Sequence, residues 1–556
     1  MIDLFPSPKR AAALGLAVLT GLAAMAVPPA ARAEGIPFSL AVPAAGPRPA
    51  AFSLAAPASG TPEDAEKPVP DAAVMPKRTK RALLELGVVA VYSTVRYWSD
   101  YHRWVEDWQY ELTCEDQYRR FLTTEAIRFD SNNYVTNWTH VIAGAFYYQM
   151  ARTNYLDWKE SLLAAFVSSL SYEYVSEWRE VISINDMFMT TFGAISLGEA
   201  WYQLSDLFHH SRSPVRRALA FMNPVNEFNQ LLDRRRPASR LYDAPGWSAF
   251  SFSAGWRHAS ETGRPAFDAA WLGVATEIIR VPEYGRPGAF RRVLKDISLS
   301  QLDIDVALRR RQPEDTHLRG GASEEVDLYA RVVPMAWYRQ DIDDAGRGYA
   351  LSLGLGSAFS YVRKRPTVYD ATSVQVHIDP LPGTPTDFRD KTSVTHLFGP
   401  VLDWTRFGRG VKVRVVADAY ADFAMMNAYA FNAYSASHSI EGMKTTLAYF
   451  GYHYALGASA SARIDLDWRG FRLRGLASAH AYGSWENRDR FQSELTNDVH
   501  AADGRTRLLL KAGWGPAGSP LSVFGAVESI HRRGRIGDFR ASGTETRTFA
   551  GLTCLF

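Results

Sequence analysis

The sequence predicts an α+β protein, in which a bundle of about four helices precedes an antiparallel transmembrane β-barrel of about twelve strands. Three observations carry this prediction. Apolar residues recur with a helical period before Trp247 and alternate with a strand period after it. The chain begins with a stretch typical of a signal peptide, and it ends on an aromatic residue, Phe556. Together these features indicate a protein of the bacterial outer membrane.

Residues 1–33 have the three parts of a signal peptide. Two basic residues precede an apolar run, and the small-residue cleavage motif "ARA" ends at Ala33. We therefore expect the mature chain to leave the cytoplasm, although an uncleaved anchor would begin in the same way. Residues 34–80 are rich in Ala and Pro and show no lasting periodicity, which predicts an extended or disordered linker.

The amino-acid composition argues against some classes of partner and of stabilising site. The 556 residues carry a net charge of +3, and this near balance argues against a nucleic-acid partner, which needs a concentrated basic surface. The two cysteines, Cys114 and Cys554, fall in different predicted domains and support no disulfide framework. Two cysteines are also too few for a cysteine-based structural zinc site.

A helical domain is predicted over residues 81–210. Four segments are apolar over more than one face, so each should be buried against a neighbour. They cover residues 82–98, 139–152, 158–181 and 184–204. Residues 211–245 are basic and predict a connector, either a solvated linker or a segment that contacts anionic lipid headgroups.

The barrel is predicted over residues 246–556. In "SASARIDLDW", Ala460, Ile464 and Trp468 face one way, whereas Arg463 and Asp465 face the other. Segments of this kind match strands with lipid outside and a polar lumen inside, although a soluble β-sandwich also alternates. Polar insertions predict long external loops, and short glycine-containing breaks predict periplasmic turns. The terminal aromatic Phe556 predicts recognition of the last strand by the barrel assembly machinery.

Two acids of the fourth helical segment call for an explanation. Ser183 and Asp186 resemble a capping box, and the helix dipole favours an acid in the first turn, so Asp186 has a structural role available. Small residues recur at Thr190, Ala194 and Gly198, which lets another helix approach closely. Glu199 lies among apolar residues with no basic neighbour in sequence. It is either a surface acid or a functional group.

Two other helical segments carry further candidates. His140 lies on one face with Tyr147, where a histidine is either a satisfied core residue or a general acid or base. Glu173 and Glu177 share a face of the third segment and repel each other, unless they are solvated, share a proton or bind a cation. The helical part contains neither a zinc-peptidase H-E-x-x-H motif nor a G-x-S-x-G elbow, and the loop from Asp130 lacks the calcium-loop pattern. We predict no metal and no cofactor.

Residues 130–201 resemble an uncharacterised bacterial envelope family, in which a helical domain of unknown function precedes an outer-membrane barrel. The segments "NWTHVIAGAFYYQMARTN", "SYEYVSEW" and "SINDMFMTTFGAISLGEAW" carry the resemblance. One departure is Val141, where the family pattern has Pro. The matching positions are His140, Gly144, Tyr147, Tyr148, Arg152, Asn154, Glu173, Tyr174, Glu177, Ser183, Asp186, Gly193, Gly198 and Glu199.

Two classes of function remain open at the level of sequence. In the first, a barrel with a periplasmic or lumen-plugging helical domain binds or passes a small envelope ligand, or maintains the envelope. In the second, an outer-membrane enzyme modifies a lipid or an envelope glycan. The candidate catalytic residues are His140, Glu173, Glu177 and Glu199. The candidate ligand-binding residues are Asn137, Tyr147, Tyr148, Arg152 and Asp186.

Overall fold

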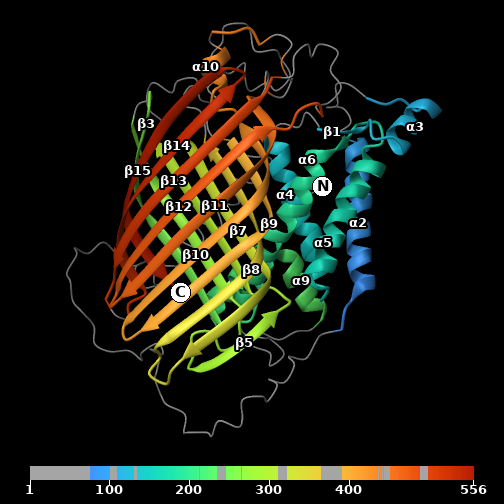
Figure 1. Ribbon diagram of the computed structural model, residues 1–556. Helices are drawn as coiled ribbons and strands as arrows, with labels where there is room; N and C mark the ends of the chain where they lie inside the picture. The colour runs from blue at the N-terminus through green and yellow to red at the C-terminus, as the bar shows by residue number, and fades with distance from the viewer. Residues whose placement is uncertain are drawn as a thin grey trace, which may run out of the picture.

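A barrel and a layer of helices make up the described part of the chain (Figure 1). The predicted signal peptide and nearly all of the predicted linker lie outside that part. The computed structural model describes residues 76–99, 109–129, 134–211, 213–233, 246–263, 266–310, 322–364, 391–435, 437–440, 443, 447, 451–488, 499–516 and 518–556.

In the described part of the chain, twelve antiparallel strands close into the barrel, as predicted from the sequence. Each strand pairs with two neighbours, and the barrel closes because β7 pairs with β8 and β15 pairs with β3. The short strand β5 (Gly288–Leu294) continues the line of β6 along the end of β7. The twelve are β3 (Trp247–Glu261), β4 (Phe267–Ile279), β6 (Leu299–Arg310), β7 (Ala322–Ile342), β8 (Gly348–Lys364), β9 (Lys391–Gly408), β10 (Val411–Asn427), β11 (Tyr452–Trp468), β12 (Phe471–Ser484), β13 (Ala501–Trp514), β14 (Leu521–Ile536) and β15 (Phe539–Leu555).

The two ends of the barrel differ. The first and last strands meet at one end, where the Phe556 N–H donates to the Phe250 carbonyl at 2.9 Å. Tight turns also lie at this end. In the turn from β11 to β12, Arg469 and Gly470 both have positive φ, as a two-residue hairpin of type I′ requires. Longer connections join most of the strands at the other end. An even strand number with this asymmetry is typical of an outer-membrane barrel.

Charged side chains point into the lumen, where ion pairs join opposite walls. Arg414 of β10 lies 2.7 Å from Glu277 of β4, five strands away around the barrel. Arg463 is 7% exposed and forms an ion pair with the same acid, whereas Ile464 beside it is 53% exposed. The alternation predicted from the sequence therefore holds, with charges inside and apolar groups outside.

The helices form the predicted bundle, with some additions. Ser183 caps α6 by accepting from the Asp186 N–H, and Asp157 with Glu160 forms a capping box on α5. Two π-helical segments, η4 and η5, interrupt the long helices. The elements are α2 (Thr79–Ser99), α3 (Cys114–Leu122), α4 (Tyr134–Arg152), α5 (Trp158–Ser171), η4 (Tyr172–Ser176), α6 (Ile184–Gly193), η5 (Ala194–Gly198), α7 (Glu199–His209), α8 (Pro214–Leu219), η6 (Ala220–Met222) and α9 (Pro224–Leu232), with the small pair β1 (Ile127–Arg128) and β2 (Ile182–Ser183) and the loop helix α10 (Phe431–Ser435).

Helix α4 packs closely against α6 and η5 along the predicted small residues. A Cβ added at Gly144 would lie 2.0 Å from the Thr190 carbonyl oxygen, and one added at Gly198 would lie 3.1 Å from the Ala145 backbone. The segment predicted as a basic connector contains α8 and α9, which pack against α7. Proline at the start of each explains why these short helices begin where they do.

The helical layer covers one side of the outer barrel wall (Figure 1). Phe208 of α7 meets Phe250 of β3 edge to face at 5.2 Å, and Phe188 of α6 lies 4.8 Å from Phe423 of β10. Both barrel residues alternate with lumen-facing neighbours and therefore point outward. The described helices thus do not fill the lumen, as a plug would. Apolar strand faces fit lipid and helices equally well, so alternation alone could not distinguish the two coverings.

Candidate functional site

The predicted site residues gather in two places along α4, which we name the His140 site and the Glu199 site. His140 and Tyr148 are eight residues apart in this helix, which separates them by about 12 Å along its axis. The predicted catalytic residues therefore do not converge on one point. The side chain of Asn137, a predicted ligand-binding residue, lies outside the described part of the chain.

The His140 site consists of His140, Glu173, Ser183, Asn185 and Asp186. His140 Nε2 lies 3.4 Å from Asp186 Oδ1, and the histidine side chain is 19% exposed while the aspartate is 1% exposed. Asn185 donates to the same Asp186 oxygen at 2.9 Å. The Ser183 backbone N–H donates to Glu173 Oε2 at 2.8 Å, which ties η4 to the start of α6. One hydrogen-bonded network therefore links His140 and Glu173 through Ser183 and its neighbours.

Buried polar groups hold the acidic segment η4 in place. Arg120, fully buried, donates to the backbone carbonyls of Glu173 and Glu177 at 2.6 and 3.0 Å. Burial, and then the charges of Glu177 and Glu173, raise the pKa of Tyr147 to about 12. The Tyr147 hydroxyl therefore remains protonated at neutral pH. A π-helical segment at this point is notable because such segments occur frequently at functional sites.

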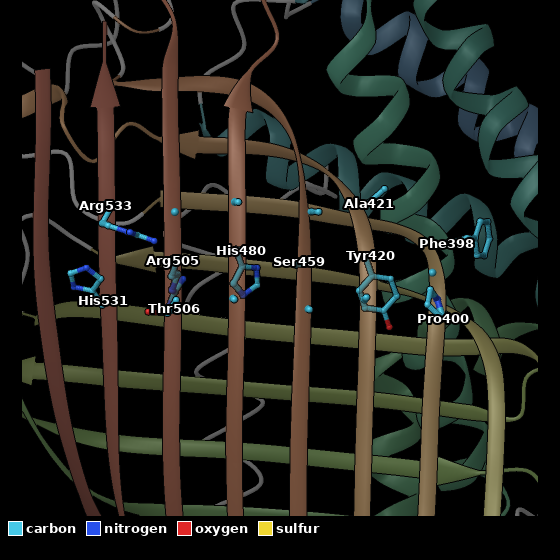
Figure 2. Close-up of a pocket in the computed structure, with 17 residues that line it drawn as sticks. Phe398, Pro400, Tyr420, Ala421, Ser459, His480, Arg505, Thr506, His531 and Arg533 are labelled. Carbon is cyan, nitrogen blue, oxygen red and sulfur yellow. The ribbon is translucent and has the colours of Figure 1, made fainter. Parts of the chain in front are cut away.

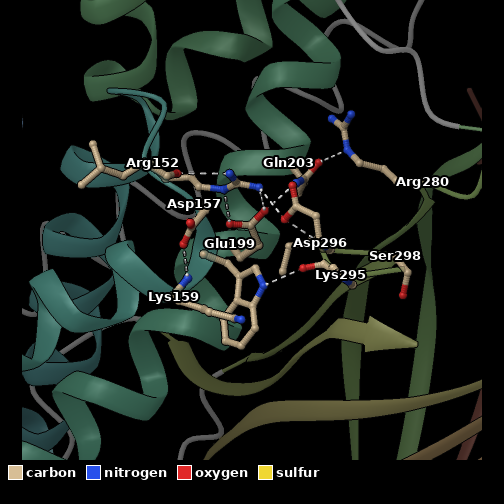
Figure 3. Close-up of polar contacts among 12 residues, drawn as sticks. Arg152, Asp157, Lys159, Glu199, Gln203, Arg280, Lys295, Asp296 and Ser298 are labelled. Carbon is tan, nitrogen blue, oxygen red and sulfur yellow. Dashed lines mark hydrogen bonds and ion pairs between the residues drawn. The ribbon is translucent and has the colours of Figure 1, made fainter. Parts of the chain in front are cut away.

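The Glu199 site joins the helices to the barrel (Figure 3). The Glu199 side chain is fully buried and accepts from Arg152 Nε at 3.0 Å and from the Tyr148 hydroxyl at 2.7 Å. Gln203 donates to the other carboxylate oxygen. Arg152 also reaches Asp296, on the barrel side, at 3.3 Å.

Two properties decide what each site can do. Glu199 is fully occupied by donors, so its arrangement is suited to holding α4, α7 and the barrel together. His140 is partly exposed beside a buried carboxylate, an arrangement that orients an imidazole for binding or for proton transfer. Among the residues that the structure describes, no three His, Cys, Asp or Glu side chains converge as ligands for a metal ion.

The sequence did not indicate the partners from the barrel. Asp296 lies 144 residues from its partner Arg152 in the chain, and Arg280 lies 77 residues from its partner Gln203. Neither residue stands in a local pattern that could have identified it. Asn185 could have been noticed, because it adjoins Asp186 in the predicted capping segment.

A family model matches part of the helical region. Residues 126–225 match the family model described as "Domain of unknown function (DUF3943)". This match confirms the resemblance to an uncharacterised family with a helical domain that precedes a barrel. The search of curated proteins found no match.

Several solved barrels are distantly similar in structure. Acinetobacter baumannii OccAB1 shares 7% identity at a TM-score of 0.16, with 56% of this chain and 96% of that chain covered. Pseudomonas aeruginosa OprD shares 9% identity at a TM-score of 0.18, with 57% and 96% covered. The strand pairing of this protein by itself closes the barrel.

Proposed function

We propose that this protein binds an envelope lipid in the bacterial outer membrane, with the barrel as its anchor and the helical layer as its lipid-facing binding domain. One observation carries the proposal. The helices pack on the outward face of the barrel wall, yet the surface they turn away from the barrel is itself apolar. A domain with this polarity is suited to lipid surroundings.

Helix α2 shows this polarity clearly. Its Leu84, Val88, Val91 and Val95 side chains are each at least 60% exposed and recur along one stripe. Glu85 on the other side accepts from Asn154 and Asn229, within the helical layer. An apolar stripe of α2 thus faces outward, while Glu85 faces the rest of the helical layer. None of the described helices is long and apolar enough to cross a membrane alone.

Other helices and the bare barrel wall extend the apolar surface. A contiguous exposed apolar surface in water costs about 25 cal/mol for each Å², and soluble proteins rarely carry large ones. Lipid is the covering that suits helices and strands alike. The exposed apolar residues include Leu163, Phe166 and Val167 of α5, Phe228, Leu231 and Leu232 of α9, and Leu508, Leu510, Val523, Val527 and Leu552 of the barrel.

His140 is the group that we assign to the polar part of the bound lipid. His140 is partly exposed, whereas the two acids of its network, Asp186 and Glu173, are buried. Passage of a small ligand through the lumen would instead have to break ion pairs between opposite walls, such as Arg414 with Glu277. We further propose that the assembly machinery recognises the last strand, ending at Phe556, before that strand pairs with β3.

Spin labelling of α2 tests the placement in lipid. The full-length chain, with Cys114 and Cys554 changed to Ser, receives a nitroxide at Val88→Cys or, as the control, at Glu115→Cys on exposed helix α3. In reconstituted vesicles we expect Val88→Cys to relax with oxygen and to be shielded from a water-soluble nickel complex. The control should show the reverse. Equal access of the nickel complex to both labels would refute the lipid-facing placement.

A catalytic role is the second candidate, because a buried carboxylate orients His140. Mass spectrometry of outer-membrane lipids tests it in a deletion strain complemented with wild type, His140→Ala or Glu173→Ala. A lipid species that changes on deletion and that neither variant restores, while both reach the membrane, would support an enzyme. Identical lipids in all strains would exclude lipid chemistry and leave binding.

A further inference from the structure

A groove runs across the bare outer wall of the barrel (Figure 2). Its volume is about 650 Å³. Alanine and glycine side chains end at or before Cβ, so the wall recedes where they cluster, whereas Ile464 and Leu508 project farther along the same strands. The outward-facing floor consists of Ala419 and Ala421 of β10, Ala458 and Ala460 of β11, Ala479 and Ala481 of β12, and Gly504 and Thr506 of β13.

The groove faces away from the lumen. Ala460 shares a face with Ile464 and Trp468, which are both 53% exposed, while Arg463, next to Ile464, is buried inside the barrel. Phe398, at the helical edge of the groove, lies 6.2 Å from Phe192 of α6. The helical layer therefore borders the groove on one side and leaves it open to the surroundings of the barrel.

The groove lies at the level of lipid headgroups. Exposed Trp468 and Trp514 stand beside the tight turns, where an aromatic girdle marks one membrane boundary. Ala458 and Gly504 each lie ten residues farther along these strands. At about 3.3 Å for each residue and a tilt of about 40°, the separation is about 25 Å, the height of the apolar band of such barrels. The groove thus meets the opposite boundary, the outer leaflet.

Unpaired cations stand at the end of the groove away from the helices. The cations are arginines: Arg533 of β14 lines the groove, and the next outward residue, Arg535, is paired in register with Arg540 of β15. All three arginines are exposed, and within the described part of the chain none of them forms an ion pair, even with Asp538 in the adjoining turn. Like charges directly opposite each other destabilise a sheet unless an anion lies between them.

We propose that this groove binds a phosphorylated, acylated glycolipid of the outer leaflet. An acyl chain would lie along the alanine floor, and phosphate would bind the guanidinium groups of Arg533, Arg535 and Arg540, which suit phosphate because they donate in pairs. The arginines are spread over two strands, which fits a lipid with more than one phosphate. The inference rests on the outer-membrane placement of the barrel, but not on the lipid-facing placement of the helices.

Native mass spectrometry of the full-length protein in detergent tests the proposal with lipid A, dephosphorylated lipid A and phosphatidylglycerol as probes. The variant Arg533→Gln/Arg535→Gln is compared with Arg409→Gln/Arg469→Gln, which removes two exposed arginines from turns at the opposite end. We expect the first variant to weaken lipid A binding at least tenfold and the control to bind as wild type. Ala479→Phe, which fills the groove, should also weaken binding, whereas Leu510→Phe on the same wall should not.

Three results would overturn the proposal. Equal loss of lipid A binding in both arginine variants would show a general charge effect. Unchanged lipid A binding in Ala479→Phe would show that the groove is not the binding site. Equal, arginine-dependent binding of phosphatidylglycerol would refute the glycolipid and leave a general phosphate site. Failure of the spin-label experiment on α2 would leave these measurements intact, so the two proposals can fail separately.

Discussion

The buried pair of Arg152 and Glu199 predicts that one substitution, Glu199→Gln, destabilises the wild type but stabilises a protein that lacks Arg152. Arg152→Met removes the cation and leaves a carboxylate with no exposed surface, held only by Tyr148 and Gln203. Breaking a buried pair by removing one partner costs about 3–5 kcal/mol, since the remaining charge is uncompensated. We therefore expect Arg152→Met to reduce the free energy of unfolding of the helical layer by about this amount.

A second substitution should recover part of the loss. In Arg152→Met/Glu199→Gln the buried charge is gone, while the amide oxygen of Gln still accepts from the Tyr148 hydroxyl. The remaining cost is that of imperfect neutral hydrogen bonds, about 1–2 kcal/mol. Glu199→Gln should thus stabilise the Arg152→Met protein by about 2–3 kcal/mol, although it destabilises the wild type, in which it leaves Arg152 without its main partner.

Urea unfolding in detergent, followed by circular dichroism at a helical wavelength, measures all four members of this cycle. The coupling energy is the difference between the effects of Glu199→Gln in the two backgrounds. A loss below about 1 kcal/mol for Arg152→Met would show that water reaches the pair. Additive effects in the cycle would show that Glu199 does not depend on Arg152, and either result would refute the reasoning.

Three further substitutions test the packing and the charge pairs of the helical layer. Gly144→Ala should cost at least about 1–3 kcal/mol, because its Cβ would lie 2.0 Å from the Thr190 carbonyl oxygen; urea midpoints measure this. Phe208→Ala should weaken the attachment of the helices to the barrel by about 3–5 kcal/mol, which limited proteolysis of the folded protein detects. Burial favours a raised pKa for Asp233, but hydrogen bonds from Arg81 and a tyrosine outweigh it and lower the pKa. Asp233→Asn should therefore lower the free energy of unfolding at any pH above the unfolded pKa of about 3.9. This difference from the wild type should disappear as the pH falls through the lower pKa of the folded protein.

Matched controls separate these effects from general damage. Gly87→Ala, where no atom of the described residues would lie within 4 Å of the added Cβ, should stabilise α2 by about 1 kcal/mol through helix propensity. Phe228→Ala, at a residue 60% exposed, should leave the attachment of the helices unchanged. If Gly87→Ala and Gly144→Ala had the same effect, close packing of α4 against α6 would not be the cause. A constant Asp233→Asn difference across pH would contradict the ion-pair explanation.

Local pattern determined much of this protein. Alternation along a strand settles which residues face the lumen, because a strand turns successive side chains to opposite faces; Ile464 and Arg463 were predictable for this reason. The count of twelve strands followed from the number of such segments. Capping by Ser183 and the close approach at Gly198 were also readable, since both depend on residues within one or two helical turns.

Only the tertiary structure decided what covers each apolar strand face and which residue pairs with each buried charge. Lipid and helices both cover apolar strand faces, so the sequence could not show that helices cover Phe250 and Phe423 while Leu508 stays bare. The partner of Glu199 comes from 47 residues away, because a buried acid needs a cation in space and not in sequence. Likewise, the groove beneath Arg533 exists because the register of neighbouring strands brings their alanines side by side.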